Sequence, residues 1–300
     1  MTFDSKLILD FINAFVNIHS FILIILGFWL RMLYVFVTKT TVAVLATKIE
    51  QPTESDIKRS IWWYTPVDGK VLFLENLDQQ SHLWYIERLV DFYYRNKSKI
   101  ADLIKNSHIS LFLLAHQTLI TQLGYDFQDQ KSVKVYHKLR DTYGKTWNWE
   151  KLSHFRWIRY TVNWYTYVKW WRYSSVQSNN FSYNKDILLK LQISFPITRS
   201  IQWVDNSNFY EINLSKWTTL CNKSFLRYKK QLGEFEKEFK KHFDRIQTSI
   251  APWKEIHLLM NVAAPFAFII GQNLHSSGPT VHLYEEHSQE YIKIFSLKRI

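Results

Sequence analysis

Two short turns in the sequence have the residue pattern of a phosphate-binding site. Ala115–Thr118 and Asn261–Pro265 each follow an apolar run typical of a buried strand and precede an apolar run typical of a helix. The first N–H groups of a helix lack partners within the helix, and the helix dipole favours negative charge beside them. Two such turns facing each other across one cleft suit a ligand with several phosphates arranged in a ring. The candidate ligand-binding residues of these turns are His116, Gln117, Thr118, Asn261, Val262 and Ala263.

Basic and aromatic residues near other strand ends could complete this anion site. Lys138 and Arg140 follow the apolar part of one predicted strand, and Arg199 follows a loop after another. Each alone is typical of a solvated surface charge, and their common position after strand ends makes a shared ligand the alternative. Trp149 either stacks on a base of the ligand or packs in the core. The candidate residues in these segments are Lys138, Arg140, Trp149, Ser194, Phe195, Thr198, Arg199 and Tyr284.

The two turns lie in two copies of one sequence pattern. The copies are His108–Tyr136 and Ile256–Tyr284, and Gly124 of the first aligns with Gly271 of the second, 147 residues later. Each copy has the pattern of a buried strand, a short loop, an apolar helix and a second buried strand, which is a βαβ unit. The duplication therefore predicts an α/β protein built from two related halves.

Other predicted elements occur in the same order in both halves. Val71–Glu75 is a predicted strand and Ser81–Ile104 a predicted helix ahead of the first copy. Asp186–Phe195 and Phe209–Leu214 are predicted strands ahead of the second copy. Between them and the second copy, Phe225–Ile246 has apolar residues every three or four positions and predicts a long amphipathic helix. The matching order supports the duplication.

The N-terminal region predicts a membrane segment. Phe11–Leu30 has twenty uncharged residues, which as a helix span about 30 Å, the thickness of the hydrocarbon layer. Basic residues follow this run, so the C-terminal part is expected to be cytoplasmic, and the single cysteine of the chain fits a reducing compartment. Met32–Thr47 is a second apolar run and predicts a second crossing, although it contains Lys39. The alternative is an amphipathic core or surface helix.

Charge and composition narrow the functions without choosing one. The 300 residues carry a formal net charge of +12, which suits a polyanionic ligand, nucleic acid or an anionic membrane surface. Only seven glycines occur, and no glycine-rich phosphate loop is present. Neither a known catalytic motif nor metal-ligand spacing occurs, so we expect no catalytic residue, metal or cofactor. Glu285, Glu286 and His287 are expected to be solvated in a loop after the last strand.

With both halves considered, the sequence resembles the SAVED domain, the cyclic-oligonucleotide sensor of bacterial CBASS antiphage systems. The resemblance covers about residues 70–300. It rests on ISLFLLAHQTLITQLGYDFQDQKSVKVYHKLRD and WNW in the first half, and on LLKLQISF, FYEINL, IHLLMNVAAPFAFIIGQNL and VHLY in the second. SAVED domains are similar to two fused CARF units, so the resemblance implies two CARF-like (Rossmann-like) subdomains. A membrane segment before such a domain is similar to the transmembrane SAVED effectors.

The resemblance also implies a ligand and partners. A cyclic di-, tri- or tetranucleotide from a partner nucleotidyltransferase would bind between the two halves during infection. Binding would drive homo-oligomerisation, in which two non-identical halves permit a head-to-tail contact. Clustered membrane segments would then disrupt the lipid bilayer of the inner membrane and cause abortive infection. His116 and Gln117 depart from the small residues or proline frequent in this loop of the family, which leaves the size and bases of the ligand open.

Two other functions stay open beside this sensor. One is a ring nuclease that cleaves the cyclic oligonucleotide it binds. The other is a basic nucleic-acid-binding membrane protein, which would bind ordinary DNA or RNA in a salt-sensitive way. The predicted parts of the chain are an N-terminal transmembrane region of one or two helices (1–49), a linker (50–69), a first CARF-like half (70–150), an aromatic connection (151–185) and a second CARF-like half (186–300).

Overall fold

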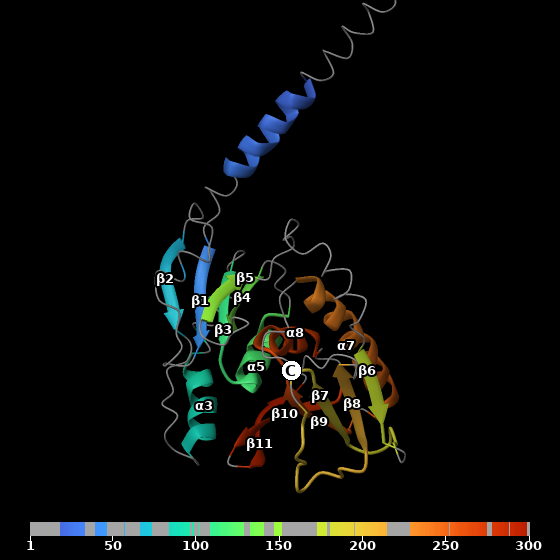
Figure 1. Ribbon diagram of the computed structural model, residues 1–300. Helices are drawn as coiled ribbons and strands as arrows, with labels where there is room; N and C mark the ends of the chain where they lie inside the picture. The colour runs from blue at the N-terminus through green and yellow to red at the C-terminus, as the bar shows by residue number, and fades with distance from the viewer. Residues whose placement is uncertain are drawn as a thin grey trace, which may run out of the picture.

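Two β-sheets, one from each half of the chain, form the frame of the computed structural model (Figure 1). Helices lie between and beside the sheets, which confirms the predicted mixed α/β fold. The residues that the structure describes are 19–33, 40–46, 67–73, 84–96, 109–128, 133–140, 147–151, 173–178, 181–194, 196–214, 229–251, 253–274, 278–287 and 289–298, together with 57, 98 and 102.

The first sheet has five strands in the order β2-β1-β3-β4-β5. The strands β1 to β4 pair in parallel, and β5 adds to β4 in the antiparallel direction. Parallel neighbours need crossover connections, as the predicted βαβ pattern requires. The strands are β1 (Thr40–Ala46), β2 (Val67–Phe73), β3 (Ile109–Leu114), β4 (Val133–Arg140) and β5 (Trp147–Lys151).

The second sheet has six strands in the order β11-β10-β9-β7-β8-β6. Its inner strands pair in parallel, and both edge strands, β6 and β11, pair in the antiparallel direction. The strand predicted at Phe209–Leu214 has the observed bounds of β8. The strands are β6 (Tyr173–Gln177), β7 (Ile187–Gln192), β8 (Phe209–Leu214), β9 (Glu255–Asn261), β10 (Thr280–His287) and β11 (Glu290–Leu297).

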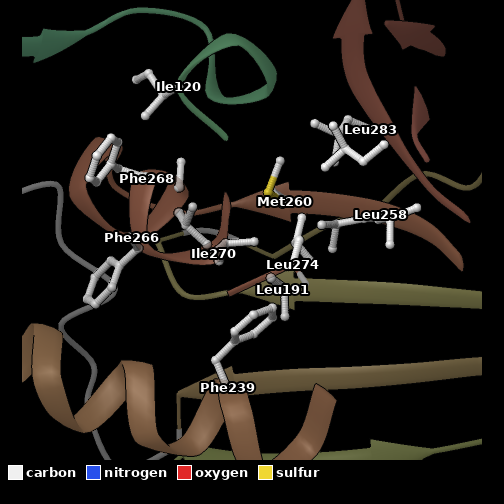
Figure 2. Close-up of a cluster of buried hydrophobic side chains, with 14 of the residues drawn as sticks. Ile120, Leu191, Phe239, Leu258, Met260, Phe266, Phe268, Ile270, Leu274 and Leu283 are labelled. Carbon is white, nitrogen blue, oxygen red and sulfur yellow. The ribbon is translucent and has the colours of Figure 1, made fainter. Parts of the chain in front are cut away.

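One hydrophobic core joins the helices to both sheets. The long helix α7 directs its regularly spaced apolar residues inward, and Phe235, Phe239 and Phe243 are all buried. Figure 2 shows Phe239 beside Leu191 of β7, below residues of α8. The amphipathic pattern predicted for this segment is therefore confirmed. The helices are α3 (Trp84–Arg95), α5 (Gln117–Asp126), α7 (Lys229–Ser249) and α8 (Ala264–Asn273).

The two sequence copies form β3–α5–β4 and β9–α8–β10, and their helices pack against each other. The aligned glycines lie at this contact. A Cβ on Gly124 would lie 2.1 Å from the carbonyl oxygen of Phe268, and a Cβ on Gly271 would lie 2.0 Å from that of Thr121. No side chain fits at either position, so the two copies need glycine for a close approach of their helices.

The N-terminal segment differs from its prediction. Residues 19–33 are helical in the described part of this segment. In the part of the chain that the structure describes, no helix is long and apolar enough to cross a membrane. This finding contradicts the predicted inner-membrane location. The first residues of the predicted span, 11–18, lie outside the described residues.

The second crossing predicted at Met32–Thr47 is also wrong. Thr40–Ala46 form β1, which lies between β2 and β3 and pairs with both. A short apolar run fits a buried strand as well as a helix, so the pattern alone did not separate the two. The first sheet therefore takes β1 from the predicted transmembrane region, and β2 begins in the last three residues of the predicted linker.

Candidate functional site

Both predicted turns begin a helix immediately after a buried strand. Helix α5 starts at Gln117 with His116 as its N-cap, and α8 starts at Ala264 with Ala263 as its N-cap. Both caps have extended backbone, and neither makes a side-chain hydrogen bond to its helix. The side chains of the two cap residues therefore leave the first N–H groups of both helices to other acceptors.

The N-termini of α5 and α8 are in direct contact. The Val262 N–H donates to Oε1 of Gln117 over 3.2 Å. Farther along, the Thr121 hydroxyl donates to the Ala267 carbonyl over 3.1 Å. The two helices thus run side by side in the same direction, and their positive dipole ends meet at one place. The structure brings together His116, Gln117, Thr118, Val262 and Ala263 from the predicted ligand-binding set.

A carboxylate from the second half occupies the N-terminus of α5. Glu285 Oε2 accepts hydrogen bonds from the Thr118 hydroxyl at 2.9 Å and from the Thr118 N–H at 3.4 Å. Its other oxygen lies 3.7 Å from Nδ1 of His116. Thr118 is fully buried. An anion therefore already binds where the sequence predicted a phosphate, and it is supplied by the chain itself.

Glu285 was expected to be a solvated loop residue, and this expectation was wrong. Residues 280–287 form β10, and β11 follows it. Alternate residues of a strand share a face, and Val281 and Leu283 are buried in the core. The same alternation carries Glu285 toward α5. That period of two was the sequence signal for its position.

The loop after β7 contacts the second turn. The N–H groups of Ile193 and Ser194 donate to the Asn261 carbonyl at 3.0 and 2.8 Å, so Ser194 and Asn261 lie together beside α8. Arg199 forms an ion pair with Glu286, the neighbour of Glu285. Thr198 is exposed in the same loop. Phe195 lies outside the described residues.

The remaining candidates of the first half lie on the β4–β5 pair. Lys138 pairs with Trp149 in the register of the two antiparallel strands, and Arg140 pairs with Trp147. Paired positions of an antiparallel ladder share a face. The backbone register therefore places Lys138 opposite Trp149 and Arg140 opposite Trp147.

Tyr284 lies away from this cluster, on the opposite face of the second sheet from Glu285. It is buried, and its hydroxyl lies 2.7 Å from Nδ1 of His257. Burial is the main reason that the pKa of Tyr284 rises to about 12, with a further contribution from Glu255. Tyr284 and His257 line a cavity of about 460 Å³, and the exposed Trp203 also lines it.

A pair of buried histidines beside this cavity was missed in the sequence. The rings of His257 and His282 stack with centroids 5.3 Å apart. Burial lowers the pKa of both, and for His257 the charge of His282 lowers it further. The pair meets because these residues oppose each other on β9 and β10. Among the described residues, no group of three His, Cys, Asp or Glu side chains could hold a metal ion.

Comparison with known proteins identifies a sensor-domain family. Residues 92–297 match the SAVED family, described as the SMODS-associated and fused to various effectors sensor domain. A search of curated proteins found no match to the chain.

Two solved structures resemble the fold. Both are the Acinetobacter baumannii Cap4 SAVED/CARF-domain containing receptor, one with the cyclic trinucleotide 2′3′3′-cAAA and one with 3′3′3′-cAAA. The first has a TM-score of 0.51 at 11% identity and covers 88% of this chain. The second has a TM-score of 0.50 at 12% identity and covers 86%. The matches span 52% and 51% of the receptor chains, so this chain corresponds to about half of their length.

Proposed function

Because the chain belongs to the SAVED family of sensor domains, we propose that it binds a cyclic oligonucleotide between its two halves. The ligand is a cyclic di-, tri- or tetranucleotide, and its phosphates bind at the N-termini of α5 and α8. The Cap4 receptors that share this fold were solved with cyclic trinucleotides, which makes a cyclic trinucleotide the first ligand to test.

The observation that carries this proposal is the contact between the two predicted turns. Gln117 at the start of α5 accepts a hydrogen bond from Val262 just before α8. Two parallel helices therefore present their positive ends at one site, and each end supplies N–H donors suited to phosphate oxygens. A ring-shaped ligand with several phosphates reaches both ends at once, whereas a single phosphate satisfies only one.

The electrostatics of the whole chain support an anionic ligand. The formal net charge of +12 raises the local concentration of anions and speeds their association. Arg199 lies on the loop after β7 and pairs with Glu286 at the end of β10, on the opposite face from Glu285. We propose that it exchanges this carboxylate for a phosphate of the ligand.

In the cell, we propose a role in CBASS antiphage defence. A partner nucleotidyltransferase supplies the cyclic oligonucleotide during infection, and binding drives copies of the chain together in a head-to-tail arrangement that leads to abortive infection. The asymmetry of the two halves supports the head-to-tail arrangement, because the two ends of such a unit differ. The chain acts by binding, without cleaving its ligand.

A ligand panel tests the proposal. Cyclic di-, tri- and tetranucleotides are added to the full chain and the melting temperature is measured, because a ligand that binds the native state stabilises it. We expect at least one of them to raise the melting temperature in a concentration-dependent way. If none does, with the unmodified chain and with the Glu285 and Glu290 variants described below alike, the proposal is wrong. Chromatography of the recovered ligand separates the sensor from the ring nuclease, since only the nuclease yields linear products.

Two matched variants locate the site. Gln117→Glu places a carboxylate at the contact of the two helix N-termini and should weaken ligand binding at least about tenfold, equal to about 1.4 kcal/mol. Gln128→Glu adds the same charge beyond the C-terminal end of α5, away from the proposed phosphates. It should change affinity less than about twofold, because the effect of the dipole on an anion falls off within one turn of the helix end. Equal effects of the two variants would place the ligand elsewhere.

A further inference from the structure

The carboxylate of Glu285 lies where the ligand's phosphate is proposed to bind on α5. It accepts hydrogen bonds from both donors of Thr118 and lies close to His116. We propose that Glu285 is an intramolecular competitor for this phosphate and thereby sets the ligand affinity of the unoccupied site. This inference rests on the proposed function, because it names the residue that regulates the same site.

Competition follows from the number of donors. The Thr118 hydroxyl has one hydrogen to donate, and Glu285 accepts it at 2.9 Å. A phosphate oxygen can bind there only after the carboxylate leaves. Hydrogen bonds to an ionised acceptor are roughly twice as strong as neutral ones, and the Glu285 side chain is only 19% exposed. Displacing it therefore removes a substantial part of the binding free energy of the ligand.

The second turn lacks such a charged competitor in the described part of the chain. There the Val262 N–H bonds to the side-chain amide of Gln117, which is neutral. A ligand exchanges this amide for a phosphate with a gain in charge assistance. At α5 one anion replaces another, and the gain is small. The two related halves thus contribute unequally, and Glu285 is the reason.

Glu285 also connects the site to the end of β10. Successive strand residues point to opposite faces, so Glu285 contacts α5 of the first half while Glu286 pairs with Arg199 on the other face. The end of this strand is held from both sides. Displacement of Glu285 removes one of these two anchors, so ligand binding at α5 loosens the end of β10.

Calorimetric titration of two charge-neutralising variants tests the inference. The probe is the cyclic oligonucleotide that gives the largest shift with the unmodified chain or, if none does, each member of the panel. Glu285→Gln should bind it about tenfold more tightly than the unmodified chain, equal to about 1.4 kcal/mol. Glu290→Gln is the matched control, because Glu290 is exposed at the start of β11 in the same hairpin. It removes the same charge and should change affinity less than about twofold.

Each result has a distinct meaning. Tighter binding by Glu285→Gln alone supports the inference, as does binding that appears only in this variant. Unchanged or weaker binding by Glu285→Gln overturns the inference and leaves the sensor function standing. Glu285 would then have no effect on ligand affinity, or would itself bind a hydroxyl of the ligand. An absence of binding in all three proteins overturns both. Glu285→Ala provides a second variant if the glutamine variant does not fold, with the same expectation.

Discussion

The crossing of α5 and α8 yields a sharp prediction about alanine substitutions. In Gly124→Ala the new methyl would lie 2.1 Å from the Phe268 carbonyl oxygen, whereas ordinary contacts begin at 3.4 Å. Because the obstacle is backbone, no side chain can rotate away, and the helices must separate by about 1.3 Å. We therefore expect Gly124→Ala to destabilise the protein, although alanine is the better helix former.

Three contributions set how much Gly124→Ala lowers the free energy of unfolding. Overpacking a tight core costs about 1 to 3 kcal/mol and sometimes more. Separation also breaks the hydrogen bond from Thr121 to the Ala267 carbonyl, worth about 1 kcal/mol. The helix propensity of alanine returns about 1 kcal/mol. The expected net loss is about 1 to 3 kcal/mol in the free energy of unfolding.

Urea denaturation followed by circular dichroism measures this loss, from the shift of the midpoint at constant slope. The control is Gly233→Ala in α7, where nothing lies within 4 Å of the new Cβ. There the same substitution should stabilise the protein by up to about 1 kcal/mol. Opposite signs in two helices of one protein separate packing from propensity. If Gly124→Ala also stabilises, or changes stability by less than about 0.5 kcal/mol, the helices do not approach as described.

The equivalent glycine adds a second check. Gly271→Ala should lower the free energy of unfolding as much as Gly124→Ala does, because its Cβ would lie 2.0 Å from the Thr121 carbonyl oxygen. One separation of the helices relieves both clashes. The double variant should therefore lose less stability than the two single losses added together, as expected for residues in contact. Strict additivity would show that the two positions respond independently.

Three further predictions concern burial and pH. Phe239 is completely buried, so Phe239→Ala should lower the free energy of unfolding by about 3 to 5 kcal/mol in the same urea assay. The pKa values of His257 and His282 are lowered from 6.5 by burial, so the unfolded state binds more protons than the native state. The free energy of unfolding should therefore fall as pH drops below 6.5. The double variant, with both histidines changed to Gln, should lose this pH dependence. Burial raises the pKa of Asp126 from 3.8 to about 6, so between these values the native state binds more protons than the unfolded state. The free energy of unfolding should therefore fall as pH rises from 4 through 6. Asp126→Asn should remove this fall, and a variant with the same pH profile as the unmodified chain would contradict the prediction.

The sequence determined the features that depend on local patterns. The repeat at 147 residues predicted two βαβ units, and the helices begin at Gln117 and Ala264 within the two predicted turns. Apolar residues every three or four positions predicted α7. These patterns are local because a helix or a strand buries one face with a period fixed by its own geometry. They establish which elements exist and where each one starts.

Local patterns did not determine which strand neighbours which. Thr40–Ala46 read as a second membrane crossing, and the structure places it between two strands of the first sheet. A continuous apolar run satisfies the requirements of both environments, since each needs only burial. The partners β2 and β3, which lie more than twenty residues beyond β1 along the chain, decide the outcome.

The contacts of the site were also decided by tertiary structure alone. The sequence showed that Gly124 and Gly271 are equivalent, but not that their helices touch. It predicted Glu285 in a solvated loop after the last strand, whereas Glu285 binds Thr118, 167 residues earlier in the chain. Such contacts depend on how the two halves are docked. That docking is set by the summed packing of many buried side chains, which no single stretch of sequence encodes.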